Sequence, residues 1–215
     1  MRLLIVTFHP EASAACDRHY PFWQKAGCDR IIGVTSRSDK SRWPTPDFIE
    51  IGPYGYISDS RLPLRLIQTI EHAISLGADE ICITEWDCIF FKPLPAVIPP
   101  GFTMNTTGGG GKNYRATRFF HPPWFFDRAS AITAVEIGRQ LLSEGIYELG
   151  SPDIFIGLIT DLAFLPINEG VFTSYSRNAF DLPGHLAEAR AAYRSGVTAI
   201  HGLKSEKELA FILAP

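Results

Sequence analysis

The chain has 215 residues and a mass of 23.9 kDa, and 46% of its residues are hydrophobic. This length suffices for one well-buried domain, and because no Ser/Gly/Pro-rich linker interrupts it, we expect a single domain over residues 1–215. The net charge of −3 and the pI of about 6.1 give no overall positive field. This charge argues against nucleic acid as a partner.

The cysteines carry no metal or redox motif. Cys16, Cys28, Cys82 and Cys88 form no C-x-x-C pair, and reduced thiols are typical of cytosolic proteins. The first apolar run is too short for a signal-sequence core or a membrane span. We therefore expect a cytoplasmic protein without a transmembrane segment, and peripheral attachment to a membrane stays open.

The first half of the chain alternates apolar runs with helical patterns. A helix is expected at 13–26, which Pro21 should kink or split, and another follows Pro63 and ends near Gly77. Strands are expected at 3–8, 31–34, 48–51 and 80–84. This alternation predicts an α/β fold in which helices flank a mostly parallel sheet.

The second half is less regular. Residues 101–112 are expected to form a polar, Gly-rich loop, and 119–126 are aromatic and extended. Helices are expected at 127–143, from Pro152 onward and at 186–194, and a short strand at 197–200. The helix that starts at Pro152 should bury one apolar face, made of Phe155, Leu158, Ile159 and Leu162.

The stretch ITEWDCIFF places two carboxylates directly after a predicted strand. Glu85 and Asp87 are two residues apart, so in an extended segment their side chains point to the same side. They would repel each other unless a divalent cation lay between or beside them. At the carboxyl end of a parallel strand such a cation could bridge a bound diphosphate. A solvated loop, or an ion pair with Lys92 or an arginine, is the alternative.

The tail supplies a second group of polar residues. In VTAIHGLKS a predicted strand ends before His201, and Lys204 follows three residues later. Imidazole can ligate a cation such as Mn²⁺, and a lysine can neutralise phosphate. A turn residue is the alternative role for His201.

The opening strand, the acidic doublet and the C-terminal His-Gly-x-Lys together resemble nucleotide-sugar glycosyltransferases of the GT-A fold. The resemblance implies a single-domain GT-A-like sheet, with Asp87 and His201 as ligands of Mn²⁺ or Mg²⁺ and Lys204 as a diphosphate contact. Glu85 occupies the first acidic position, where the family has Asp. This departure leaves open whether Glu85 ligates the metal directly or instead hydrogen-bonds the ribose or a metal-bound water.

Further polar residues follow the first two strands. Thr7 and His9 follow the first strand and Thr35 follows the second, where this fold lines its nucleotide pocket. Arg61 and Arg65 are four residues apart at a helix start and could pair with phosphate. Ordinary loop residues and a solvated helix face are the alternatives.

The segment GSPDIFIG resembles the position of the acceptor-side base in inverting members of the family. Asp153 would deprotonate the acceptor hydroxyl there. The alternative is first-turn helix chemistry, in which the helix dipole would lower the pKa of Asp153.

Two other segments invite an interpretation. TTGGGGKNY does not fit a phosphate-binding loop and is expected to be a mobile loop near the acceptor. Trp124 offers a stacking surface for a sugar ring, or is part of the core.

The sequence therefore predicts a metal-dependent glycosyltransferase of the hexosyltransferase type. Its donor would be a nucleoside diphosphate sugar, and its acceptor a hydroxyl of a glycan or a small molecule. A non-catalytic nucleotide- or sugar-binding GT-A homologue is the first alternative. A metal phosphoesterase is the second, with a site made of His9, Asp87, His121 and His201.

Overall fold

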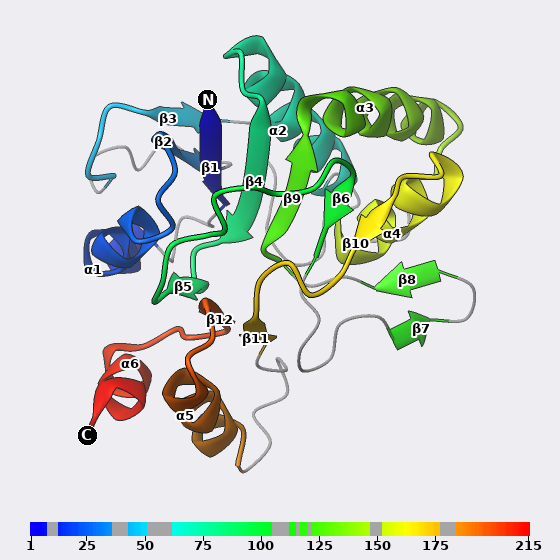
Figure 1. Ribbon diagram of the computed structural model, residues 1–215. Coiled ribbons are helices and arrows are strands. Elements are labelled where there is room, and N and C mark those ends of the chain that lie inside the picture. The colour runs from blue at the N-terminus through cyan, green and yellow to red at the C-terminus, as the bar shows by residue number, and fades with distance from the viewer. Residues whose placement is uncertain are drawn as a thin grey trace.

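The structure, a computed structural model, describes most of the chain (Figure 1). The described residues are 1–7, 13–35, 43–50, 62–104, 112–114, 117–119, 122–146, 152–176 and 184–215.

A seven-stranded sheet forms the centre of the molecule, in the order β10-β6-β9-β4-β1-β2-β3. Only β9 is antiparallel to its neighbours β4 and β6, so the sheet is mixed and mostly parallel. The strands are β1 (Arg2–Thr7), β2 (Arg30–Thr35), β3 (Phe48–Glu50), β4 (Glu80–Glu85), β6 (Phe102–Thr103), β9 (Trp124–Asp127) and β10 (Ile167–Asn168). The predicted α/β class with a mostly parallel sheet is confirmed.

Two smaller sheets and the helices complete the described structure. The three-stranded sheet has the order β11-β12-β5, and β7 pairs with β8. These strands are β5 (Ile89–Phe90), β7 (Lys112–Tyr114), β8 (Thr117–Phe119), β11 (Ser174–Ser176) and β12 (Ala199–His201). The helices are α1 (Ser13–Gln24), α2 (Leu62–Ser75), α3 (Arg128–Ser143), α4 (Pro152–Leu162), α5 (His185–Ser195) and α6 (Glu206–Leu213).

Alternate residues of the central strands pack on opposite faces of the sheet, as the two-residue period of a strand requires. Leu3 and Ile5 of β1 belong to a core cluster with residues of α2, α3 and α4. Leu4 and Val6 belong to a second cluster, with residues of α1. The sheet therefore lies between α1 on one face and α2, α3 and α4 on the other.

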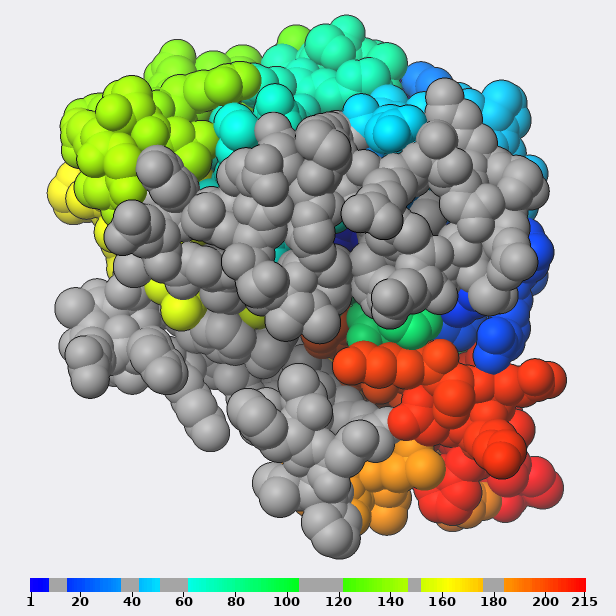
Figure 2. Space-filling view, turned by 180° about the vertical axis from the view of Figure 1, so that it is seen from behind, coloured from blue at the N-terminus to red at the C-terminus, as the bar shows by residue number. Residues whose placement is uncertain are grey.

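A third apolar cluster joins the small sheet to the C-terminal helices. Ile89 of β5 and Ile200 of β12 pack with Leu209 and Ile212 of α6, and Phe22 of α1 lies against them. Figure 2 shows the orange and red C-terminal residues gathered at one end of the molecule, next to the blue N-terminal ones. This packing places the end of β12 beside the end of β4.

Two sequence predictions need correction. Pro21 does not split the predicted helix, because α1 continues through it to Gln24. A proline removes the hydrogen bond to the carbonyl four residues earlier, which is that of Asp17, and both Pro21 and Asp17 are exposed to water. The second correction concerns residues 101–112, where β6 begins at Phe102 and β7 at Lys112.

The buried face of α4 also differs from the prediction. Phe155 and Ile159 are buried as expected, but Leu162 is 48% exposed and Ile156 is buried instead. The period of a helix allows either Leu162 or Ile156 to join Phe155 and Ile159 on the buried face. Packing of α4 against α2 and α3 buries Ile156. No helix in the described ranges is both long enough and apolar enough to cross a membrane.

Candidate functional site

The site lies where the strand order of the sheet changes direction. From β1 the chain adds β2 and β3 on one side and then β4 on the other. Ligands of open α/β sheets collect at the carboxyl ends of the strands at such a point. Thr7, the last residue of β1, pairs in register with Glu85, the last residue of β4. Glu85 therefore lies at the edge where a ligand is expected.

The small sheet carries His201 to this edge. After Glu85 the chain turns and enters β5, which pairs antiparallel with β12. At the end of β12 the backbone amides of Gly202 and Leu203 donate hydrogen bonds to the carbonyl oxygen of Asp87, at 3.1 and 3.0 Å. These bonds tie the tail to the turn that carries the acidic pair.

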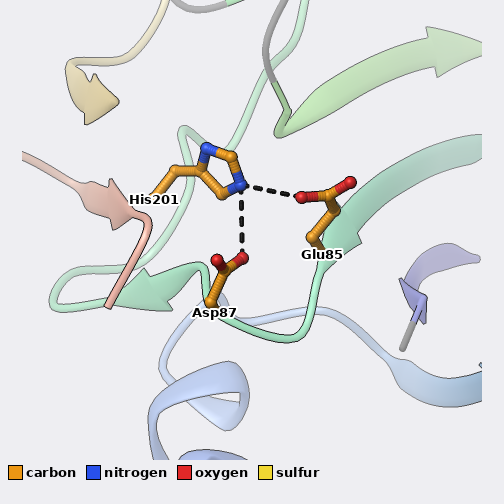
Figure 3. Close-up of side chains that lie close together, drawn as sticks. All are labelled: Glu85, Asp87 and His201. Atoms are coloured by element: carbon orange, nitrogen blue, oxygen red, sulfur yellow. Dashed lines mark hydrogen bonds and ion pairs between the residues drawn. The ribbon is translucent and has the colours of Figure 1, made fainter. Parts of the chain in front are cut away.

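His201 points between the two carboxylates (Figure 3). Its Nε2 lies 2.9 Å from Oε2 of Glu85 and 3.2 Å from Oδ1 of Asp87. Asp87 and His201 are 4% and 7% exposed, and Glu85 is partly buried. The structure therefore brings Glu85 and Asp87 together with His201, as the sequence predicted.

The ionisation of Asp87 and that of His201 depend on each other. Burial disfavours the charged form of His201, but the carboxylates of Asp87 and Glu85 outweigh it and raise the imidazole pKa well above its usual value. Burial would likewise raise the pKa of Asp87, but His201 and then Lys204 outweigh it and lower that pKa. Without a metal, His201 is therefore an imidazolium that compensates two carboxylates.

The donor set and its spacing fit a divalent cation. Ligand atoms of Glu85, Asp87 and His201 all lie within 4.8 Å of one another. In an octahedral site with bonds of about 2.1 Å, neighbouring ligand atoms lie about 3.0 Å apart, close to the two separations from Nε2. Oδ1 of Asp87 is buried and accepts no well-aligned hydrogen bond within the described part of the chain, since Nε2 of His201, 3.2 Å away, lies closer to Glu85. One imidazole with two carboxylates suits Mn²⁺ better than Mg²⁺, which prefers oxygen ligands alone.

Asp153 belongs to the same electrostatic environment. It is the second residue of α4, and burial, followed by the charge of Glu85, raises its pKa well above the usual value, while His201 opposes the shift. The alternative for Asp153, a pKa lowered by the helix dipole, is not met, because burial and a neighbouring carboxylate raise that pKa. The carboxyl group of Asp153 therefore retains its proton to a higher pH than an ordinary aspartate does.

The predicted residues at the other strand ends have local roles. The hydroxyl of Thr7 donates to the carbonyl oxygen of Thr84 at 3.2 Å. Thr35 ends β2 and is fully buried. Arg65 is 4% exposed, and its Nη2 donates to the carbonyl oxygen of Val34 at 2.9 Å. The Arg65 guanidinium thus stabilises the carboxyl end of β2.

Some of the remaining residues that the sequence predicted for the site lie in the part of the chain that the structure describes, and others do not. The side chain of Lys204 is exposed, and its charge acts on Asp87. Trp124 is 3% exposed and packs in the core, so it presents no sugar-stacking surface. The predictions for His9, Arg61, His121 and the Gly-rich stretch 105–111 lie outside the described residues.

Sequence reasoning missed His19, which is fully buried beneath the acidic turn. Its Nδ1 lies 2.9 Å from the carbonyl oxygen of Trp86, and the two rings stack 5.9 Å apart. The separation of 67 positions along the chain hides this contact from any local pattern.

No known family matches the chain, and no curated protein matches it significantly. The geometry of the site therefore carries the functional argument.

Proposed function

We propose that this protein is a metal-dependent glycosyltransferase that moves a sugar from a nucleoside diphosphate sugar to an acceptor hydroxyl. The observation that carries the proposal is the convergence of Glu85, Asp87 and His201 at the carboxyl edge of β1 and β4. A purely structural ion pair needs neither a second buried carboxylate nor this position. The resemblance of the short motifs to GT-A enzymes agrees with it.

The reaction requires the bond between the anomeric carbon and the diphosphate to break while the acceptor oxygen bonds to that carbon. Glu85, Asp87 and His201 would hold the cation, which when bound supplies positive charge to the departing diphosphate. Lys204, exposed beside Asp87, would add a point charge to the same leaving group.

Asp153 is the candidate base for the acceptor hydroxyl. Its raised pKa brings the carboxyl group closer to neutral pH, where a base accepts a proton most effectively. The group must first lose its own proton, so the rate should rise with pH through its raised pKa.

Binding and turnover can be tested in the same preparation. Calorimetry with UDP and with GDP, with and without Mn²⁺, should give binding that depends on the metal. Sugar nucleotides should then be hydrolysed slowly, with release of the nucleoside diphosphate.

Nucleotide binding without any turnover towards sugar nucleotides and acceptors would favour the non-catalytic homologue. Phosphate release from simple esters would favour a phosphoesterase. No binding with either nucleotide would refute the proposal.

Asp153→Asn should lower the transfer rate by about 100-fold or more, the usual contribution of a general base, while Mn²⁺ affinity changes little. The amide keeps the size of the side chain but cannot accept the proton. The matched control is Asp161→Asn, in the last turn of the same helix. A variant that keeps the wild-type rate and pH profile would remove Asp153 from the mechanism.

A further inference from the structure

The backbone of the acidic turn is held by hydrogen bonds from three directions. The amide of Trp86 donates to the carbonyl oxygen of Thr7 at 3.0 Å. The carbonyl oxygen of Asp87 accepts from the tail, as described above. Two ring nitrogens of α1, those of His19 and Trp23, contact the carbonyl oxygens of Trp86 and Cys88, each at 2.9 Å.

The hydrogen bond of His19 has a defined direction. A carbonyl oxygen only accepts, so Nδ1 must carry the proton. Burial lowers the pKa of His19, which favours a neutral ring with its other nitrogen bare. Nε2 is buried and has no hydrogen-bond partner within the described ranges. The ring is therefore held by Nδ1, by its near-parallel stack on Trp86, with an interplanar angle of 9°, and by an edge-on contact with Trp23.

This hydrogen bond acts on the peptide plane that orients Asp87. The carbonyl of Trp86 and the amide nitrogen of Asp87 belong to one rigid plane. Fixing the carbonyl oxygen therefore fixes the direction in which the chain enters Asp87 and restricts the directions that its carboxylate can take. A rotation of this plane would turn Asp87 away from His201 while Glu85, at the end of β4, stayed in place.

We infer that His19 is a positioning residue, whose Nδ1–H holds the Trp86 carbonyl so that Glu85 and Asp87 face the same cation. The inference rests on the proposed function for its effect on metal affinity and turnover. Its effect on geometry is independent of that function.

Two substitutions separate the hydrogen bond from the stack. His19→Asn keeps an amide N–H near the position of Nδ1 and removes the ring. His19→Phe keeps the ring and removes the donor. Measured by calorimetry with MnCl₂ alone, affinity should fall by about 10- to 100-fold in His19→Phe, as expected when a group supporting a metal ligand is lost. It should stay within about threefold of wild type in His19→Asn.

The matched control is Trp23→Phe, which removes the other ring donor of the same helix face. Its acceptor, the carbonyl of Cys88, lies beyond Asp87, so this variant should lose stability but keep its Mn²⁺ affinity. If Trp23→Phe and His19→Phe lose affinity equally, or if His19→Phe binds like wild type, the positioning role is refuted. Should His19→Phe fail to fold, His19→Gln takes its place, because its amide lies nearer the position of Nε2.

A failure of the proposed function can be distinguished from a failure of the positioning role of His19. If the wild-type protein binds no Mn²⁺, that function falls, and crystal structures of the metal-free variants decide the inference. The separation of Nε2 of His201 from Oδ1 of Asp87, 3.2 Å in the wild type, should widen in His19→Phe and persist in His19→Asn. An unchanged separation in His19→Phe would overturn the inference.

Discussion

Asp87→Asn is expected to abolish Mn²⁺ binding and sugar transfer and to lower the stability of the metal-free protein at neutral pH. The amide removes one anionic ligand, and affinity should fall by more than about 100-fold, since even supporting groups contribute 10- to 100-fold. Without the metal, His201 and Lys204 lower the pKa of Asp87, so its charge stabilises the folded state and the amide loses that contribution.

Mn²⁺ affinity separates a metal site from an ordinary ion pair, because both lose stability when the carboxylate is removed. Removing one partner of a buried structural pair typically lowers the free energy of unfolding by about 3–5 kcal/mol. Urea unfolding in a chelating buffer, together with calorimetry with MnCl₂, measures both effects. Asp17→Asn, at an exposed position on α1, is the control for loss of a carboxylate. Wild-type Mn²⁺ affinity in Asp87→Asn would exclude Asp87 as a ligand.

His201→Gln should also lower the stability of the metal-free protein. It removes the only imidazolium of the described site and leaves Asp87 and Glu85 as neighbouring carboxylates without compensation. We expect the free energy of unfolding at pH 7 to fall by about 3–5 kcal/mol, as for a buried charge that loses its partner.

The pH dependence of that loss has a definite sign. Without His201, burial raises the pKa of Asp87 in the folded state above its unfolded value of about 3.9. The folded variant then holds its proton more tightly than the unfolded chain does, so its stability falls as the pH rises through the raised pKa. The difference from wild type should be largest near neutral pH and should shrink towards pH 4.

The wild-type protein without metal should follow a different curve. The lowered pKa of Asp87 contributes stability above pH 4, which is lost as the pH falls through the folded value. The raised pKa of His201 contributes stability below about pH 6.5, which is lost as the pH rises through the folded value. These two groups together favour maximum stability between about pH 4 and 6.5.

Urea titrations at several pH values in a chelating buffer measure these curves. His72→Gln, in the last turn of α2, serves as the control for loss of an imidazole. Equal stability of His201→Gln and wild type at pH 7 would mean that the imidazole does not compensate the carboxylates.

Local patterns were sufficient for the class of the fold and for half of the site. Apolar runs in alternation with amphipathic helices predicted β1, β2, β4 and α2, because neighbouring residues alone determine which faces of these elements are apolar. The two-residue spacing predicted Glu85 and Asp87 on one side of an extended segment; in the structure β4 ends at Glu85, and a turn at Trp86 and Asp87 brings both carboxylates to His201. Short elements such as β5 and β6, two residues each, carry too few residues for a period to appear.

The sequence by itself determined the layered architecture and the acidic pair, since both follow from contacts between residues close along the chain. Only the tertiary structure decided that His201, 116 residues after Glu85, meets that pair, and that His19 supports it from the opposite face of the turn. It also decided the raised pKa of Asp153, which burial and a distant carboxylate produce against the local helix dipole. Packing of the whole chain sets these distances and the local dielectric, and no local pattern contains them.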